Sequence, residues 1–98
     1  MQEENQKHCQ SVTLCNRRGL HARAAARFAA TADPFPGNIS VEFNDRVVNG
    51  KSIMGLMMLA AAYEKTITIC CEHPEREQCE QALSTLVELV ENRFDESE

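Results

Sequence analysis

Tryptophan is absent from this 98-residue sequence, aromatic residues make up only 5% of it, and it has only three prolines and four glycines. Apolar runs long enough to span a membrane are also missing. The first ten residues, MQEENQKHCQ, are polar and do not resemble a secretory signal. These absences predict a single small domain over residues 1–98 that is located in the cytoplasm and has no membrane partner.

Several common catalytic motifs are missing as well. The sequence contains no GxSxG, HExxH or GxGxxG pattern, which argues against a self-sufficient hydrolase. The segment NGKS, residues 49–52, ends like a phosphate-binding P-loop, but Asp45 stands where that motif requires glycine. The sequence therefore offers no nucleotide site, and we predict no cofactor.

Five cysteines are present, but none belongs to a CxxC pair. Adjacent Cys70 and Cys71 on a strand would point to opposite faces of a sheet, which makes them poor partners for each other. We expect free thiols, as is usual in a reducing compartment. A metal site is the alternative, with candidate ligands Cys70, Cys71, His73 and Cys79. Their spacing matches no regular zinc pattern, so we predict no metal.

Charge is distributed unevenly along the chain, whose formal net charge is −5. Residues 11–32 contain four arginines and no acid, and these arginines surround His21. Residues 72–98 contain nine acids and only two arginines, and they end in FDESE, which we expect to be a frayed tail. The overall acidity argues against binding to nucleic acid. The local basic patch instead favours an anionic group or an acidic protein partner, although ordinary solvated arginines would account for most of it.

Hydrophobic periodicity and turn residues predict the element order β-α-β-β-α-β-α. Strands are expected around residues 12–14, 39–43, 47–48 and 66–72. Helices are expected at residues 22–32, from a cap at 52 to about 59, and from about 74 to 94. Antiparallel strands with one face covered by helices give an α+β fold. Its core should extend from about residue 11 to 94, between a short polar N-terminus and an acidic tail.

His21 is the first candidate for chemistry. Gly19 can form a sharp turn just before it, and the predicted helix begins directly after it. A helix N-terminus presents unpaired N–H groups that bind phosphate and disfavour the imidazolium form. A neutral imidazole can attack phosphorus, and Arg23 can pair with phosphate oxygens. The alternative interpretation is a capping or surface histidine without a chemical role.

Ser52 and the apolar run after it form the second candidate. As an N-cap, Ser52 needs no further purpose, but a phosphate on its hydroxyl would meet the N–H groups of the next helix. Apolar residues surround the whole predicted helix in the segment IMGLMML. Either the helix is fully buried, or it exposes a methionine-rich face that suits protein docking.

Two motifs together resemble those of a known family. The segments GLHAR, which holds His21, and GKSIMGLMML, which holds Ser52, are similar to the two signatures of HPr, the histidine-containing phosphocarrier of the bacterial phosphoenolpyruvate phosphotransferase system. The resemblance runs from about residue 11 to 94. The segments MMLAA and FDE look closer to the nitrogen-regulatory branch than to the sugar-transport branch. The resemblance implies an open-faced β-sandwich, with a four-stranded antiparallel sheet covered on one face by three helices.

The resemblance also implies roles for individual residues. His21 matches the histidine that enzyme I phosphorylates on Nδ1 and that passes the group to a IIA protein or domain. Arg23 matches the arginine that supports the phosphohistidine, and Ser52 the serine that an HPr kinase/phosphorylase modifies in some bacteria. The implied docking face consists of Leu20, Ala26, Ile53, Met54 and Met57. Such a protein is a monomeric carrier of a covalent phosphoryl group rather than a free-standing catalyst.

One departure from the family pattern lies in the site, because Ala24 replaces the proline that usually follows the arginine. Alanine is a good helix former, so we expect function to survive this change. One alternative function is an interaction module that signals through Ser52 and no longer transfers phosphate. A small metal-binding protein that uses the cysteines is the other.

Overall fold

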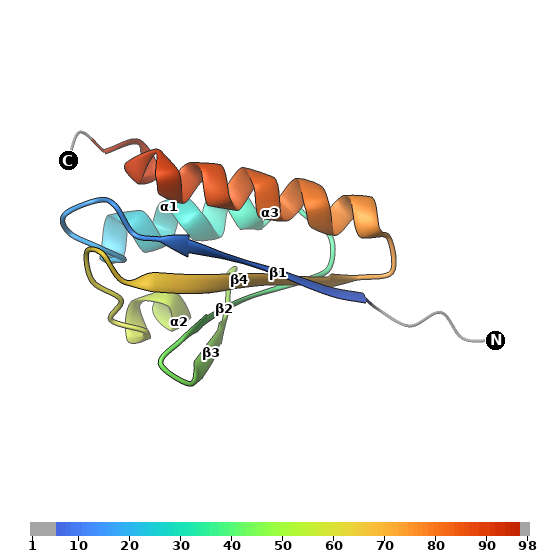
Figure 1. Cartoon of the computed structure of the whole chain (residues 1–98), viewed down its shortest axis with the longest axis horizontal. Helices are drawn as coiled ribbons and strands as arrows, with labels where there is room; N and C mark the ends of the chain where they lie inside the picture. Colours follow the sequence, from blue (N-terminus) through green and yellow to red (C-terminus); the bar gives the residue numbers. More distant parts are fainter. Residues whose placement is uncertain (1–5, 97–98) are drawn as a thin grey trace.

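The computed structural model describes residues 6–96 and contains the expected succession of strands and helices (Figure 1). Its strands are β1 (Gln6–Thr13), β2 (Asn38–Phe43), β3 (Arg46–Asn49) and β4 (Thr66–His73). Its helices are α1 (Ala22–Ala32), α2 (Ile53–Met58) and α3 (Arg76–Glu91), followed by a 3₁₀ turn, η1 (Arg93–Asp95). The predicted α+β class and element order are confirmed.

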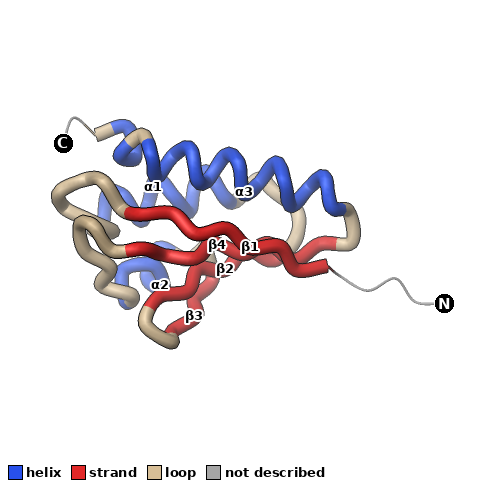
Figure 2. Tube along the Cα trace, in the orientation of Figure 1, coloured by secondary structure: helices blue, strands red, loops and turns tan. Residues whose placement is uncertain are grey.

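The four strands form one antiparallel sheet in the order β1-β4-β2-β3 (Figure 2). In Figure 1, α1 and α3 run alongside each other on one side of this sheet. Strand β4, with Ile67, Ile69 and Cys71 on its helix-facing side, lies between β1 and β2 and forms the centre of the core. The opposite face is polar, with hydroxyl pairs such as Ser11–Thr68. A half-covered sheet of this kind explains why the strands alternate in polarity.

Several elements lie where local sequence signals predict them. Helix α1 spans the residues predicted for it, and its alanines let it pack closely, with Ala24, Ala25 and Phe28 fully buried. The tight turn at Asn44-Asp45, between the two strands predicted at residues 39–43 and 47–48, has φ values of 51° and 66°, as a two-residue hairpin loop with both central residues left-handed requires. These predictions succeed because the interactions that fix each element lie within a few residues of one another.

One strand and one helix have bounds that differ from the predicted ones. Strand β1 begins at Gln6 rather than near Val12, because pairing with β4 gives hydrogen-bond partners to a stretch whose side chains are mostly exposed. Helix α3 ends at Glu91, so Phe94 does not belong to its apolar stripe. Phe94 lies instead in η1 with φ 53° and is only 1% exposed. Two tight turns, closed by Asp95 N–H to the Asn92 carbonyl and Glu96 N–H to the Arg93 carbonyl, place the ring in the core beyond the end of the helix.

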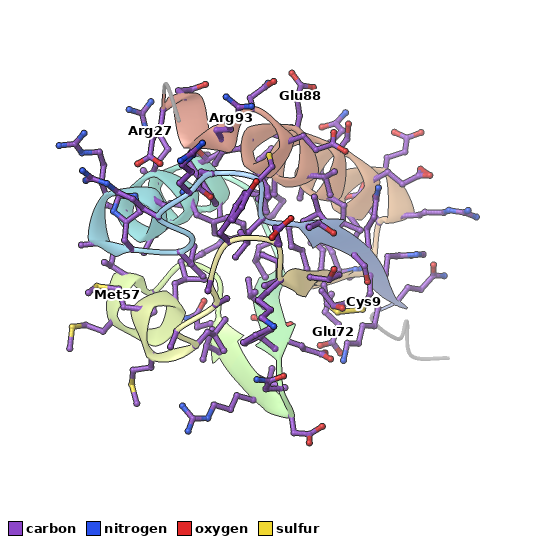
Figure 3. The ribbon with its side chains drawn as sticks, turned by 60° about the vertical axis from the view of Figure 1, so that its left-hand side comes forward. Cys9, Arg27, Met57, Glu72, Glu88 and Arg93 are labelled. Carbon is purple, nitrogen blue, oxygen red and sulfur yellow. A yellow bond between two sulfur atoms is a disulfide. The ribbon has the colours of Figure 1, made fainter. Side chains whose placement is uncertain are left out.

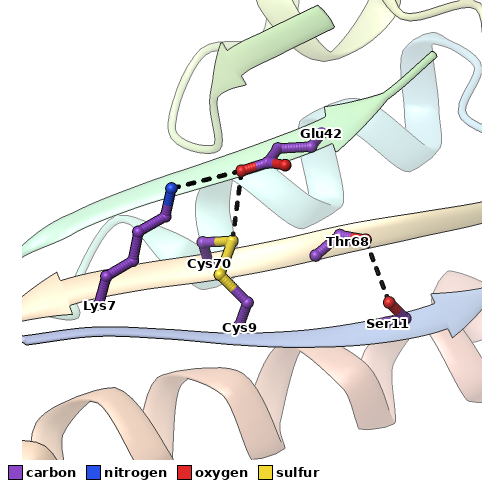
Figure 4. Close-up of a disulfide and its surroundings, with 6 residues drawn as sticks. All are labelled: Lys7, Cys9, Ser11, Glu42, Thr68 and Cys70. Atoms are coloured by element: carbon purple, nitrogen blue, oxygen red, sulfur yellow. Dashed lines mark hydrogen bonds and ion pairs between the residues drawn. A yellow bond between two sulfur atoms is a disulfide. The ribbon is translucent and has the colours of Figure 1, made fainter. Parts of the chain in front are cut away.

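The expectation that all five thiols are free is wrong. Cys9 and Cys70 face each other in the β1–β4 register and form a disulfide (Figure 4). Beside it, Glu42 Oε2 lies 3.5 Å from Cys70 Sγ and 3.5 Å from Lys7 Nζ. Sequence reasoning missed the bond because the two cysteines are 61 residues apart and only the strand register brings them together. Cys15, Cys71 and Cys79 are free thiols.

Cys71 and Cys79 form a buried thiol pair, with neither side chain exposed. Burial, followed by hydrogen bonding and charge repulsion with Cys79, raises the pKa of Cys71 from 9.0 to about 12. The folded state therefore holds this proton more tightly than the unfolded state, and the resulting stability is complete below pH 9 and is lost as pH rises towards 12.

We expect the free energy of unfolding to fall by about 2 kcal/mol between pH 8 and 10.5 through this thiol. Denaturant unfolding at a series of pH values measures the slope. Cys71→Ala should lower the stability at pH 8 but flatten the decline above pH 9. An equally steep decline in that variant would contradict the assignment to Cys71.

Helices long and apolar enough to cross a membrane do not occur between residues 6 and 96.

Candidate functional site

A tight loop between β1 and α1 places His21 at the protein surface, where it is partly exposed. Gly19 adopts φ +65°, and a Cβ atom on it would come within 2.6 Å of the Ala61 carbonyl oxygen, so only glycine fits. The N–H of the next residue, Leu20, donates to that same oxygen at 2.9 Å. The loop is therefore anchored against the segment before β4, and His21 leaves it in a fixed direction.

His21 is the N-cap residue of α1, as predicted. Its backbone is extended, with φ −81° and ψ −177°, and its carbonyl accepts the first helical hydrogen bond, from Ala25 N–H at 2.8 Å. Its side chain does not cap the helix. The ring thus lies beside the N–H groups and the positive dipole end of α1, where an anion bound to it would be stabilised.

The imidazole ring is held by a carboxylate that the sequence analysis did not identify. His21 Nε2 lies 2.6 Å from Glu96 Oε2, and both side chains are largely buried, with 22% and 14% exposed. An ionised carboxylate only accepts hydrogen bonds, so Nε2 is the protonated nitrogen in this contact. In the neutral ring the lone pair then lies on Nδ1. Glu96 therefore selects both the tautomer and the orientation of His21.

Asn16 donates a hydrogen bond to the other oxygen of this carboxylate. Its side chain is completely buried, and its Nδ2 donates to Glu96 Oε1 at 3.0 Å and to the Gly19 carbonyl at 2.8 Å. Its Oδ1 has no hydrogen-bond partner among the described residues. Asn16, Glu96 and His21 thus form one chain of hydrogen bonds that also fixes the loop glycine.

Residues 93–96 are folded onto the site, so the expected frayed tail is wrong for Phe94, Asp95 and Glu96. Three successive residues of η1 have positive φ values, and the buried Phe94 ring anchors them. Arg27 on α1 pairs with Asp95 at 3.1 Å. The expected tail residues Ser97 and Glu98 lie outside the described residues. No sequence motif indicates these contacts, which depend on the left-handed turn that follows α3.

Four arginines line a cavity of about 430 Å³ next to this segment. Its lining residues are Arg17, Arg18, Arg23, Arg27, Phe94, Asp95 and Glu96. Arg23, the predicted partner of a phosphohistidine, is exposed and makes no ion pair within residues 6–96. The four arginines of the acid-free segment therefore line one cavity. Glu96, which contacts His21, is also part of its lining.

Ser52 occupies the predicted cap position on α2. Its backbone is extended, and its Oγ accepts a hydrogen bond from Gly55 N–H at 3.0 Å. The side chain is partly exposed. Position 52 can therefore be reached from solvent while it stabilises the first turn of a helix of only six residues.

Helix α2 has one buried side and one exposed apolar side. Leu56 and Leu59 are buried, whereas Ile53, Met54, Met57 and Met58 are 42–72% exposed. In Figure 3, Arg27 and Met57 both lie on the left of the molecule, and Cys9 lies on the right. Of the two residues expected beside the histidine in a docking face, Ala26 is partly exposed. Leu20 is only 4% exposed and packs in the core, so it cannot present its side chain to a partner.

The residues considered for a metal site do not converge. Cys70 is disulfide-bonded, whereas Cys71 belongs to the helix-facing core. His73 Nδ1 accepts a hydrogen bond from Glu75 N–H at 2.9 Å. Between residues 6 and 96, no three histidine, cysteine or acidic side chains are grouped so as to hold a metal ion.

Comparison with known proteins identifies relatives that match nearly the whole chain. The family model described as "PTS HPr component phosphorylation site" matches residues 9–92. The phosphocarrier protein HPr of Pseudomonas aeruginosa is 48% identical over 88 residues, which cover 89% of this chain and 94% of that protein. The phosphocarrier protein NPr of Shewanella violacea is 36% identical over 86 residues, which cover 88% and 91%. The crystal structure of HPr-C-His from Thermoanaerobacter tengcongensis has a TM-score of 0.82 at 36% identity, and the match covers 93% of this chain and 99% of that one.

Proposed function

Because the chain belongs to the HPr family of phosphocarrier proteins, we propose that it accepts a phosphoryl group on Nδ1 of His21 from phosphorylated enzyme I and passes it to a IIA protein or domain. The contact between His21 Nε2 and Glu96 is the observation that carries this assignment. It leaves Nδ1 as the nitrogen with the free lone pair.

The chemistry is a pair of reversible displacements. The Nδ1 lone pair attacks phosphorus, an N–P bond forms, and the bond that held the phosphoryl group on enzyme I breaks. The acceptor group of the IIA protein then attacks the same phosphorus and releases His21. In this scheme the protein carries a covalent intermediate and is not a free-standing catalyst.

Arg23 and the first turn of α1 stabilise the transferred charge in this proposal. Phosphoryl transfer depends mainly on positioning and on electrostatic stabilisation of the phosphate oxygens. Arg23 lies in the first turn of the helix whose N-cap residue is His21. It forms no ion pair with any described residue, so its guanidinium group is available to a phosphate. The N–H groups of that turn provide further donors.

Partner docking uses the exposed apolar side of α2 together with the basic surface around His21. Ile53, Met54 and Met57 provide adaptable apolar contacts, and Ala26 provides a small neighbouring surface. Acidic surfaces on enzyme I and on the IIA protein would be steered towards the arginines. Leu20 is not part of this docking surface because its side chain is buried.

Intact-mass spectrometry tests the proposed function. The protein is incubated with phosphoenolpyruvate, Mg²⁺ and purified enzyme I from its own source. We expect one added phosphoryl group that is lost in acid and that transfers on addition of a IIA protein. Absence of any mass change would refute the carrier function and would leave signalling through Ser52 as the function to test.

A negative charge at position 52 should slow the uptake of phosphate. Ser52→Asp keeps an N-cap residue on α2, so the fold should persist, but it adds a charge beside the apolar docking surface. We expect the initial rate of phosphorylation of His21 at subsaturating protein to fall at least about tenfold, which corresponds to about 1.4 kcal/mol. Ser52→Asn is the matched uncharged control. An equal rate in the two variants would refute an effect of the charge.

The remaining assignments follow from the family. We place the protein in the cytoplasm of a bacterium as a monomer, with an HPr kinase/phosphorylase as a further partner where the source encodes one, and without nucleic-acid or membrane partners. Relatives named HPr and NPr both match the chain, so assignment to the nitrogen-regulatory branch stays a prediction.

A further inference from the structure

The cavity beside His21 concentrates positive charge beyond what one transferred phosphoryl group needs. Arg17 and Arg18 come from the loop before α1, whereas Arg23 and Arg27 lie one turn apart on α1. Side chains four residues apart on a helix point to the same side. The loop and the helix thus each contribute two guanidinium groups to one cavity.

These arginines have no structural role that explains their grouping. All four are exposed, and the core beside them is filled by Phe28 and Phe94. Like charges that line one cavity repel one another, and an anion bound between them relieves this repulsion. Of these four arginines, only Arg27 has an ion-pair partner within residues 6–96, namely Asp95.

The protein's own carboxylates already occupy part of the cavity wall. Asp95 lies 3.1 Å from Arg27, and Glu96 is held by His21 and Asn16. Two carboxylates against four guanidinium groups leave an excess of positive charge in a protein of net charge −5. This excess matches the charge of a ligand with more than one anionic group.

The cavity is large enough to hold a small molecule. Its volume of about 430 Å³ falls in the range of pockets that hold metabolites, which is 300–1,000 Å³. Guanidinium groups bind phosphate through paired N–H donors, so two pairs of arginines suit two phosphate groups. We infer that this cavity binds a small anion with two or more linked phosphate groups, at a site separate from Nδ1 of His21.

Binding of inorganic pyrophosphate, measured by calorimetry at constant ionic strength, tests the inference. We expect pyrophosphate to bind at least about tenfold more tightly than orthophosphate, because a single phosphate engages only one pair of arginines. The double variant Arg17→Gln/Arg18→Gln should weaken pyrophosphate binding at least about tenfold. Arg76→Gln is the control, because Arg76 lies on α3, outside the cavity, and pairs with Glu80. It should bind like the unaltered protein.

A variant with the opposite effect separates a built site from general charge attraction. Asp95→Asn removes the carboxylate that competes for Arg27 and should tighten pyrophosphate binding severalfold. Backbone amide chemical shifts should change on titration for residues 17–27 and 93–96. Equal affinity for pyrophosphate and orthophosphate, or equal weakening by Arg76→Gln, would overturn the inference. Chemical-shift changes away from these residues would overturn it as well. These readouts use the unphosphorylated protein without enzyme I, so they succeed or fail separately from the proposed function.

Discussion

His21→Gln is expected to accept no measurable phosphoryl group from phosphorylated enzyme I, a loss of roughly 10³-fold or more in initial rate. The amide of glutamine can still donate a hydrogen bond to Glu96, so the hydrogen-bond chain to Asn16 can persist. What disappears is the nitrogen lone pair at the N-terminus of α1. Because no histidine lines the neighbouring cavity, nothing can replace this lone pair.

The other two histidines provide matched controls. His8 lies on β1, where its Nε2 contacts Gln6 at 3.2 Å, and His73 accepts a hydrogen bond from Glu75 N–H. Neither lies beside the arginine cavity. We expect His8→Gln and His73→Gln to take up phosphate at the unaltered rate, as measured by intact mass over time. If His21→Gln still took up acid-labile phosphate, or if His73→Gln took up none, His21 would not be the acceptor.

Local signals explain why so much of the site could be predicted. Gly19 marks a turn that only glycine can form, His21 stands directly before an alanine-rich helix, and Ser52 stands before a second helix. Each of these features depends on residues within one or two helical turns. The motifs that resemble the HPr family consist of the same local features, and the family and its fold are therefore confirmed together.

Contacts between distant segments explain what could not be predicted. Glu96 contacts His21 across 75 residues, after a turn in which Arg93, Phe94 and Asp95 adopt a left-handed conformation that sequence patterns do not reveal. The acidic composition of the C-terminal residues suggested a solvated tail, yet the same charges are attracted to the arginines of α1. The order of the strands, which decides the partner of Cys9, was not accessible from alternation either.

Removal of the Cys9–Cys70 disulfide should have the largest effect on stability. The bond joins residues 61 positions apart, and closing a loop of that size in the unfolded chain corresponds to about 4 kcal/mol in the chain-entropy model. We expect the double variant Cys9→Ser/Cys70→Ser to lose about this much free energy of unfolding, with a fall in Tm of more than about 10 °C. Cys15→Ser is the matched control, because Cys15 is a free thiol that hydrogen-bonds to carbonyl groups at the end of α3.

The same bond makes stability depend on the redox state of the surroundings. The predicted cytoplasmic location is a compartment in which glutathione and thioredoxin keep thiols reduced. Cys9 is exposed at an edge strand, so a reductant can reach the bond from solvent. A thiol restored at Cys70 would lie next to the Glu42 carboxylate, to which it could donate a hydrogen bond.

Thermal unfolding with and without dithiothreitol therefore separates the bond from the side chains that form it. The unaltered protein should lose stability on reduction and approach the double variant, while the double variant should not respond to reductant. Because the sheet retains its backbone hydrogen bonds and its core, the reduced protein should remain folded at 25 °C and keep accepting phosphate on His21. Identical Tm values for the oxidised protein and the double variant would mean that the register of β1 and β4, rather than the covalent bond, holds this edge of the sheet in place.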